Sequence, residues 1–364
     1  PQTKVEYKVA MITDYGDITD QSFNQTTYEA CKAFAEDNSI EFSYFKPAGD
    51  NTADRVAMIE SAVDEGYNVI VMPGYAFGGA IVEAAPEFPD VKFIALDVAA
   101  GDLLETAVAK AGETYDYTPE NWDLNKYVDM SNVYCAVYQE ELCGYMAGYA
   151  AVKLGYKSLG FLGGMAVPAV VRYGYGFVQG VDAAAADLGL TDVKLNYIYG
   201  GQFFGDANIT AKMEGWYTTG TEIVFACGGG IYTSAVEAAL KSKAYVVGVD
   251  VDQHYIGEKA VAENGYNPFV TSAMKGLKEA TESALGKFFD GTWADIGGKV
   301  ETLNLQAGDF VGLPTAEASW GFKTFTMDEY NQLIEDIRSG KLVVSDEIAE
   351  HPAVAENVTV NYID

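Results

Sequence analysis

The sequence predicts an α/β protein made of two doubly wound lobes. Its 364 residues exceed the length of about 250 to 300 residues at which a single hydrophobic core usually divides. Short apolar runs alternate with stretches of helical spacing, and this alternation stops and then restarts once along the chain. Repeated βαβ units imply parallel sheets covered by helices on both faces.

In the first lobe, strands and helices are expected to alternate up to residue 97. The predicted strands are Lys8–Thr13, Glu41–Phe45, Asn68–Met72 and Val91–Asp97. The predicted helices are Asn24–Ala35, Ala53–Glu65 and Phe77–Ala85. The polar stretch from Ala99 to Asn132 has little apolar periodicity, so we expect a surface loop or insertion there.

The second lobe repeats this build from residue 133. The predicted strands are Val133–Val137, Ser158–Leu162, Lys194–Tyr199, Glu222–Ala226, Tyr245–Val249 and Phe269–Ser272. The predicted helices are Leu142–Leu154, Val170–Leu188, Asn208–Tyr217, Tyr232–Lys241, Leu277–Phe289 and, in a mixed tail, Met327–Ser339. We expect an N-terminal lobe of residues 1–132 and 254–292, and a C-terminal lobe of residues 133–253 and 293–364. Because ligands bind outside the carboxyl ends of the strands in such sheets, a cleft between the lobes is the expected site.

Charge and composition exclude several classes of protein. The chain has 23 Lys and Arg against 53 Asp and Glu, a formal net charge of -30, so nucleic acid and anionic membrane surfaces should repel it. It contains no run of 18 or more apolar residues. It begins at Pro1 without Met, which suggests a mature form whose targeting segment has been removed.

No metal or cofactor motif is present. The cysteines lack the spacing of a metal site, and the sequence contains neither GxGxxG nor GxxxxGK[ST]. Of the two histidines, His254 and His351, His254 follows a strand end and could approach a cleft, but we expect it in an exposed loop rather than in a catalytic system. The cysteines are Cys31, Cys135, Cys143 and Cys227.

Several acids lie where strands are expected to end. Asp97 and Asp250 could each accept hydrogen bonds from two vicinal hydroxyls, as recognition of a sugar requires, and Lys275 could pair with them. Acids that cap helices and a surface lysine are the alternative. Asp20 and Ser22 are expected to cap the first helix, whereas Phe23 could stack on a ligand or belong to the local core.

Six ordered stretches resemble the basic membrane lipoprotein (PnrA-like) family of substrate-binding proteins of ABC importers. The resemblance covers roughly residues 8–340 and implies a type I periplasmic-binding-protein fold, with two Rossmann-like lobes joined by a hinge. The stretches are DYGDITDQSFNQ (14–25), GYAFGGAI (74–81), EELCGYMAGYAA (140–151), LGFLGGMAVPAVVRYGYGF (159–177), GVDVDQ (248–253) and TSAMK (271–275).

The resemblance implies how a purine base would be held. Phe23 and an aromatic in the stretch GQFFGD, for which we favour Phe204, would sandwich the ring. Asp14 and Asn24 would contact the base or its edge, and Asp97 would hold the base or help to close the lobes.

The resemblance assigns the sugar to other residues. Asp250 and Lys275 would bind the ribose hydroxyls, and Gly228 would let the backbone approach closely. The sequence departs from the family pattern at Tyr15, at Cys143 and in the polar stretch 102–132, which leaves the preferred base open.

The first hypothesis is therefore an extracytoplasmic receptor for a purine nucleoside, without catalytic residues or a cofactor. It would be a monomer, anchored by a lipidated cysteine preceding Pro1 and partnered by an ABC transporter permease. A second hypothesis replaces the ligand by a flavin, a sugar or a signalling molecule. A third is a nucleoside hydrolase that uses Asp14, Asp17 and Asp20 with calcium, although no nucleophile elbow or poised histidine is present.

Overall fold

The computed structural model describes residues 6–354 and 357–364 and shows two compact α/β units. Unit 1 comprises Pro1–Val137 and Leu277–Thr302, and unit 2 comprises Tyr138–Gly276 and Leu303–Asp364. The chain therefore passes from one unit to the other three times. Among the described residues, no helix combines the length and the apolar character that crossing a membrane requires.

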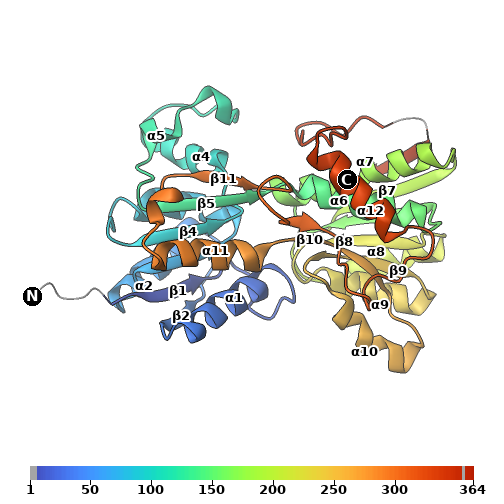
Figure 1. Cartoon of the computed structure of the whole chain (residues 1–364), viewed down its shortest axis with the longest axis horizontal. Coiled ribbons are helices and arrows are strands. Elements are labelled where there is room, and N and C mark those ends of the chain that lie inside the picture. Colours follow the sequence, from blue (N-terminus) through green and yellow to red (C-terminus); the bar gives the residue numbers. More distant parts are fainter. Residues whose placement is uncertain (1–5, 355–356) are drawn as a thin grey trace, which may run out of the picture. The chain divides into compact units, whose positions relative to one another are not determined.

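Unit 1 contains a six-stranded sheet in the order β11-β5-β4-β3-β1-β2 (Figure 1). Strands β1 to β5 pair in parallel. Its strands are β1 (Lys8–Ile12), β2 (Glu41–Phe45), β3 (Val69–Pro73), β4 (Lys92–Leu96), β5 (Val133–Tyr138) and β11 (Val300–Leu303). Its helices are α1 (Phe23–Asp37), α2 (Thr52–Asp64), α3 (Gly78–Ala84), α4 (Ala100–Lys110), α5 (Leu124–Tyr127) and α11 (Leu277–Phe289).

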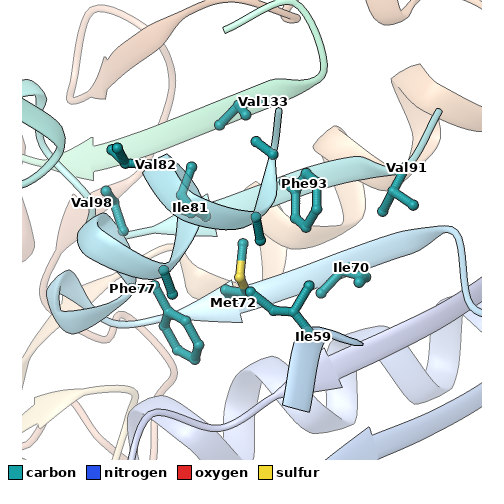
Figure 2. Close-up of a cluster of buried hydrophobic side chains, with 14 of the residues drawn as sticks. Ile59, Ile70, Met72, Phe77, Ile81, Val82, Val91, Phe93, Val98 and Val133 are labelled. Carbon is teal, nitrogen blue, oxygen red and sulfur yellow. The ribbon is translucent and has the colours of Figure 1, made fainter. Parts of the chain in front are cut away.

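The core of unit 1 forms on the faces of its sheet, because successive side chains of a strand point to opposite faces. In β3, Ile70 and Met72 face α2 and α3, and they form one cluster with Ile59 and Ile81 (Figure 2). The intervening residue Val71 is equally buried, because helices cover both faces of the sheet. Buried runs in which every residue is apolar are what identified these strands in the sequence.

Unit 2 contains a seven-stranded sheet in the order β12-β10-β9-β8-β6-β7-β13. Strand β13 is parallel to β7, whereas β12 is antiparallel to β10. Its strands are β6 (Ser158–Gly163), β7 (Val193–Tyr199), β8 (Ile223–Cys227), β9 (Tyr245–Asp250), β10 (Phe269–Lys275), β12 (Val311–Gly312) and β13 (Val358–Ile363). Its helices are α6 (Glu140–Lys153), α7 (Pro168–Asp187), α8 (Ala207–Thr218), α9 (Tyr232–Ser242), α10 (His254–Asn264) and α12 (Met327–Arg338).

The α/β class and the mainly parallel pairing in the two sheets agree with the sequence prediction, but the predicted lobe boundaries do not match the two units. Strand β5 belongs to unit 1 because it pairs with β4, although we predicted that residue 133 opens the second lobe. Residues 254–276 belong to unit 2 because β10 pairs with β9. Residues 293–302 belong to unit 1, where β11 occupies a sheet edge.

Two local predictions were also wrong. The stretch 99–132 is not a plain loop, because α4 buries Leu103, Leu104 and Val108 against the unit. His254 does not lie in an exposed loop, because it is the half-buried first residue of α10.

Helices α6 and α7 of unit 2 approach each other so closely that their backbones touch. A Cβ atom at Gly176 would lie 2.0 Å from the carbonyl oxygen of Glu141, and one at Gly144 would lie 2.3 Å from that of Tyr173. Only glycine fits such a contact. The glycines in the contact are Gly144 and Gly148 of α6, and Gly176 and Gly180 of α7.

We expect Gly176→Ala to destabilise unit 2 by roughly 1 to 3 kcal/mol, because the new methyl group must separate the two helices. The loss would exceed the gain of about 1 kcal/mol in helix propensity. Gly215→Ala in α8 is the matched control, since a Cβ there meets nothing within 4 Å. Urea unfolding followed by circular dichroism measures both, and an equal stability of the two variants would contradict the packing argument.

Candidate functional site

Asp14 follows β1 at the carboxyl edge of the sheet in unit 1. Its Oδ1 accepts hydrogen bonds from the backbone N–H of Tyr15 at 2.6 Å and of Gly16 at 2.7 Å, and from Asn24 Nδ2 at 3.3 Å. Burial raises the pKa of the Asp14 carboxyl group, and these donors oppose that rise. The turn thus holds a half-buried carboxyl group in a fixed orientation.

Asn24 is 4% exposed and its amide orientation is set by its neighbours. Its Nδ2 donates to Asp14 and also to Asp20 Oδ2, at 3.2 Å. Its Oδ1 is buried and has no hydrogen-bond partner among the described residues. An acceptor held in this way is suited to an N–H donor on a ligand, because leaving it unpaired costs free energy.

Two of the three acids of the hydrolase hypothesis, Asp20 and Asp17, have separate structural roles. Asp20 caps α1, because its carboxylate accepts from the backbone N–H groups of Ser22, Asn24 and Gln25 at 2.9 to 3.0 Å. Asp17 is exposed and its Oδ2 lies 3.3 Å from Lys46 Nζ. The capping role predicted for Asp20 is therefore confirmed, whereas the side chain of Ser22 makes no capping hydrogen bond.

Phe23 and Asp97 occupy the same carboxyl edge of unit 1. Phe23 is the half-buried first residue of α1. Asp97 directly follows β4 and adopts a left-handed backbone conformation, with φ of 59°. A residue other than glycine in this conformation carries strain, which is common at ligand sites.

In unit 2, Asp250 and Lys275 are brought together as the last residues of adjacent strands. Asp250 is 6% exposed, has φ of 67° and accepts a hydrogen bond from the Tyr173 hydroxyl at 3.0 Å. Lys275 is 5% exposed, and its Nζ lies 3.9 Å from Asp250 Oδ1. The pair predicted from the sequence is present, and it is buried.

Two residues that we did not predict complete this cluster. Glu140, the first residue of α6, accepts from Lys275 Nζ at 3.1 Å and from Arg172 Nε at 2.8 Å. Burial alone would raise the pKa of Glu140, but the positive charges of Arg172 and Lys275 outweigh it and lower the pKa. The sequence signal that could have indicated Glu140 is the pair of consecutive acids, Glu140 and Glu141, at the start of an otherwise mostly apolar helix.

Phe203 and Phe204 have different environments. Phe204 is 58% exposed, and its backbone forms a bridge to Gly230. The Phe203 ring instead packs beside Gly164 and Gly228, where a Cβ atom would lie 2.4 Å and 2.9 Å from its Cδ1. Gly228 has φ of 142°, so its position requires glycine for both conformation and space.

Reactive or metal-binding clusters are absent from the described parts of the chain. Within residues 6–354 and 357–364, no group of three or more His, Cys, Asp and Glu is placed to hold a metal ion. All four cysteines are free and buried. Burial raises the pKa of each thiol, which disfavours the reactive thiolate.

A family model described as ABC transporter substrate-binding protein PnrA-like matches residues 7–348. The chain belongs to this family. Membership implies a small-molecule ligand and a transporter permease as partner. The family resemblance drawn from the sequence is thereby confirmed.

Relatives of this PnrA-like protein are similar over most of their length. The ABC transporter nucleoside-binding protein BmpA of Lactococcus lactis is 26% identical over 94% of this chain and 90% of its own. Basic membrane protein B of Borreliella burgdorferi is 25% identical over 85% of this chain and 81% of its own.

Solved structures of solute-binding proteins share the fold. One from Aeropyrum pernix K1 has a TM-score of 0.71 at 18% identity and covers 94% of each chain. One from Conexibacter woesei has a TM-score of 0.67 at 21% identity, covering 93% of this chain and 99% of the other. Together with the two parallel-sheet units, they confirm the predicted type I fold.

The second acid of α6 leads to a prediction on pH and stability. Burial, with the negative charge of Glu140 adding to it, raises the pKa of Glu141 from its ordinary value of 4.5 to about 8. The folded protein keeps this proton up to about pH 8, whereas the unfolded chain loses it near pH 4.5. The free energy of unfolding therefore falls as pH rises from about 5 to about 8, because ionisation stabilises the unfolded chain. Above about pH 8 the loss is complete.

Glu141→Gln cannot ionise, so its stability relative to the wild type should grow by up to roughly 1.4 kcal/mol per pH unit across this range. Urea unfolding at pH 5.5 and 8.5 measures the difference. Glu263→Gln, a change at an exposed residue of α10, is the control. A difference between Glu141→Gln and the wild type that does not depend on pH would contradict the assignment.

Proposed function

We propose that this protein binds a purine nucleoside and delivers it to an ABC importer. The observation that carries the proposal is the buried Asp250 and Lys275 pair, at the carboxyl edge of a sheet that also displays the exposed ring of Phe204. A sugar bound there would find an acceptor and a donor, and a flat base would find a ring to stack on. The name of the relative BmpA, a nucleoside-binding protein, supports this ligand class.

The ribose would contact the charged pair. A carboxylate can accept from two vicinal hydroxyls, and an ammonium can donate to a hydroxyl oxygen. Charge-assisted hydrogen bonds of this kind are stronger than neutral ones. Because Asp250 and Lys275 are almost fully buried, water competes little for these contacts. Gly228, at the same edge, would allow the backbone to approach the ligand.

The base would be stacked and read at its edge. Phe204 would supply one stacking face and Phe23 the other, while Asn24 Oδ1 would accept an N–H of the base and Asp14 would contact it nearby. Asp97 would hold the base or help the lobes to close on it. In this proposal residues of both units contribute to the binding of one molecule.

The proposed role is transport rather than catalysis. The relative BmpA is named a nucleoside-binding protein, and two of the three acids of the hydrolase hypothesis, Asp20 and Asp17, serve as a cap and in a surface ion pair of unit 1. Relatives in two Pyrococcus species are named lipoproteins, which supports an extracytoplasmic location with a lipid anchor. The protein would act as a monomer beside the permease.

Isothermal titration calorimetry with adenosine, guanosine, inosine, uridine, riboflavin and ribose tests the proposal. We expect one purine nucleoside to bind per protein and to be recovered intact by chromatography. Phe204→Ala and Asp250→Asn should each weaken that binding about tenfold or more, because stacking and a charged hydrogen bond are each worth about 1 to 3 kcal/mol.

Glu263→Gln serves as the control for these variants and should bind as the wild type does. Binding of riboflavin or ribose alone, or of no nucleoside, would reject the ligand class and leave the family membership intact. Release of free base from the nucleoside would reject the transport role in favour of the hydrolase.

A further inference from the structure

We propose that Glu140 is a positioning residue that holds the Lys275 ammonium at the distance from Asp250 that ribose binding requires. This inference rests on the proposed function. Glu140 itself is fully buried and contacts no ligand in this scheme. It would act on the ligand through Lys275.

Both oxygens of the Glu140 carboxylate are bound by cations. Oε1 accepts from Lys275 Nζ at 3.1 Å, and Oε2 accepts from Arg172 Nε at 2.8 Å. The carboxylate lies at the first residue of α6, where the helix dipole also favours a negative charge. Arg172 comes from α7, so the glycine-lined contact between α6 and α7 sets the position of the Glu140 carboxylate and of its partner.

The carboxylates of Glu140 and Asp250 lie at different distances from Lys275. Its Nζ is 3.1 Å from Glu140 but 3.9 Å from Asp250, beyond hydrogen-bond distance. The rings of Tyr138 and Tyr173 lie 5.3 Å and 5.5 Å from the same Nζ and limit the paths of a flexible side chain. Glu140 therefore competes with Asp250 for the ammonium.

This competition explains why a binding site would contain an extra buried acid. Without the charge of Glu140, less attraction would hold Lys275 away from Asp250, and the two would move together into a direct ion pair. In such an ion pair the Asp250 carboxylate and the Lys275 ammonium would bind each other, and they would no longer be available to the ribose hydroxyls. The negative charges of Glu140 and Asp250 also balance the positive charges of Arg172 and Lys275, which reduces the free-energy cost of burying the cluster.

The test compares Glu140→Gln with the wild type, using a purine nucleoside and its free base as the two ligands. Glutamine keeps the size and one acceptor but removes the charge. We expect the affinity for the nucleoside to fall about tenfold, as for loss of a charged hydrogen bond, while the affinity for the free base changes less than about twofold. Calorimetry measures the affinity for the nucleoside. Displacement of the bound nucleoside by the free base measures the affinity for the base.

A second arm tests whether Glu140 acts through Lys275. In a Lys275→Met background, Glu140→Gln should cause no further loss of nucleoside affinity, because the group that it positions is gone. Glu140→Asp keeps the charge but draws the carboxylate back from Lys275, so it should weaken nucleoside binding more than free-base binding. This variant supplies the comparison with the wild type if Glu140→Gln does not fold, and it should bind the nucleoside more tightly than Glu140→Gln if both fold. Glu263→Gln is the matched control for removal of a glutamate charge.

Different results overturn different statements. Equal losses for nucleoside and free base, or the same loss in the Lys275→Met background, would show that Glu140 serves folding alone. Unchanged nucleoside affinity in both Glu140 variants would also overturn the positioning role. A wild-type protein that binds no purine nucleoside would instead overturn the proposed function, and this inference with it.

Discussion

The backbone contact between α6 and α7 is the constraint on which the charged cluster of unit 2 depends. Gly144 and Gly176 let the two helices approach until a Cβ atom at either position would meet a carbonyl oxygen. At this separation Glu140 of α6 reaches Arg172 of α7, and the hydroxyl of Tyr173 reaches Asp250. A wider spacing would leave buried charges without partners, which is among the most costly defects in a protein interior.

The parallel sheet supplies the other half of the cluster. Strands β9 and β10 are neighbours, and Asp250 is in register with Met274, so the following residue Lys275 lies beside it at the carboxyl edge. The strand order β5-β4-β3-β1-β2 in unit 1 matches β10-β9-β8-β6-β7 in unit 2, and this makes Asp97 the counterpart of Asp250. Both aspartates have left-handed backbone conformations, which cost about 1 to 3 kcal/mol each. The same strained position thus ends the equivalent strand in each unit.

Much of the fold could be predicted because the buried parts of β1, β3 and β4 are unbroken apolar runs. β2 has the predicted bounds, and β1, β3 and β4 lie within one residue of theirs at each end. The helix α4 was missed because its polar face and the following polar residues conceal an amphipathic pattern that is only a few turns long. The unit boundaries were wrong because membership of a sheet depends on strand pairing, which local periodicity does not encode.

The sequence by itself determined the α/β class, the family and the positions where acids and glycines end strands, since these depend on local pattern and on short motifs. Only the tertiary structure decided that Asp250 and Lys275 are buried together, that Phe204 rather than Phe203 is exposed, and that Glu140 and Arg172 join the cluster. Lys275 and Glu140 are 135 residues apart in the chain. Their contact depends on how α6 packs against α7 and β10, and packing over such a separation leaves no periodic signal in the sequence.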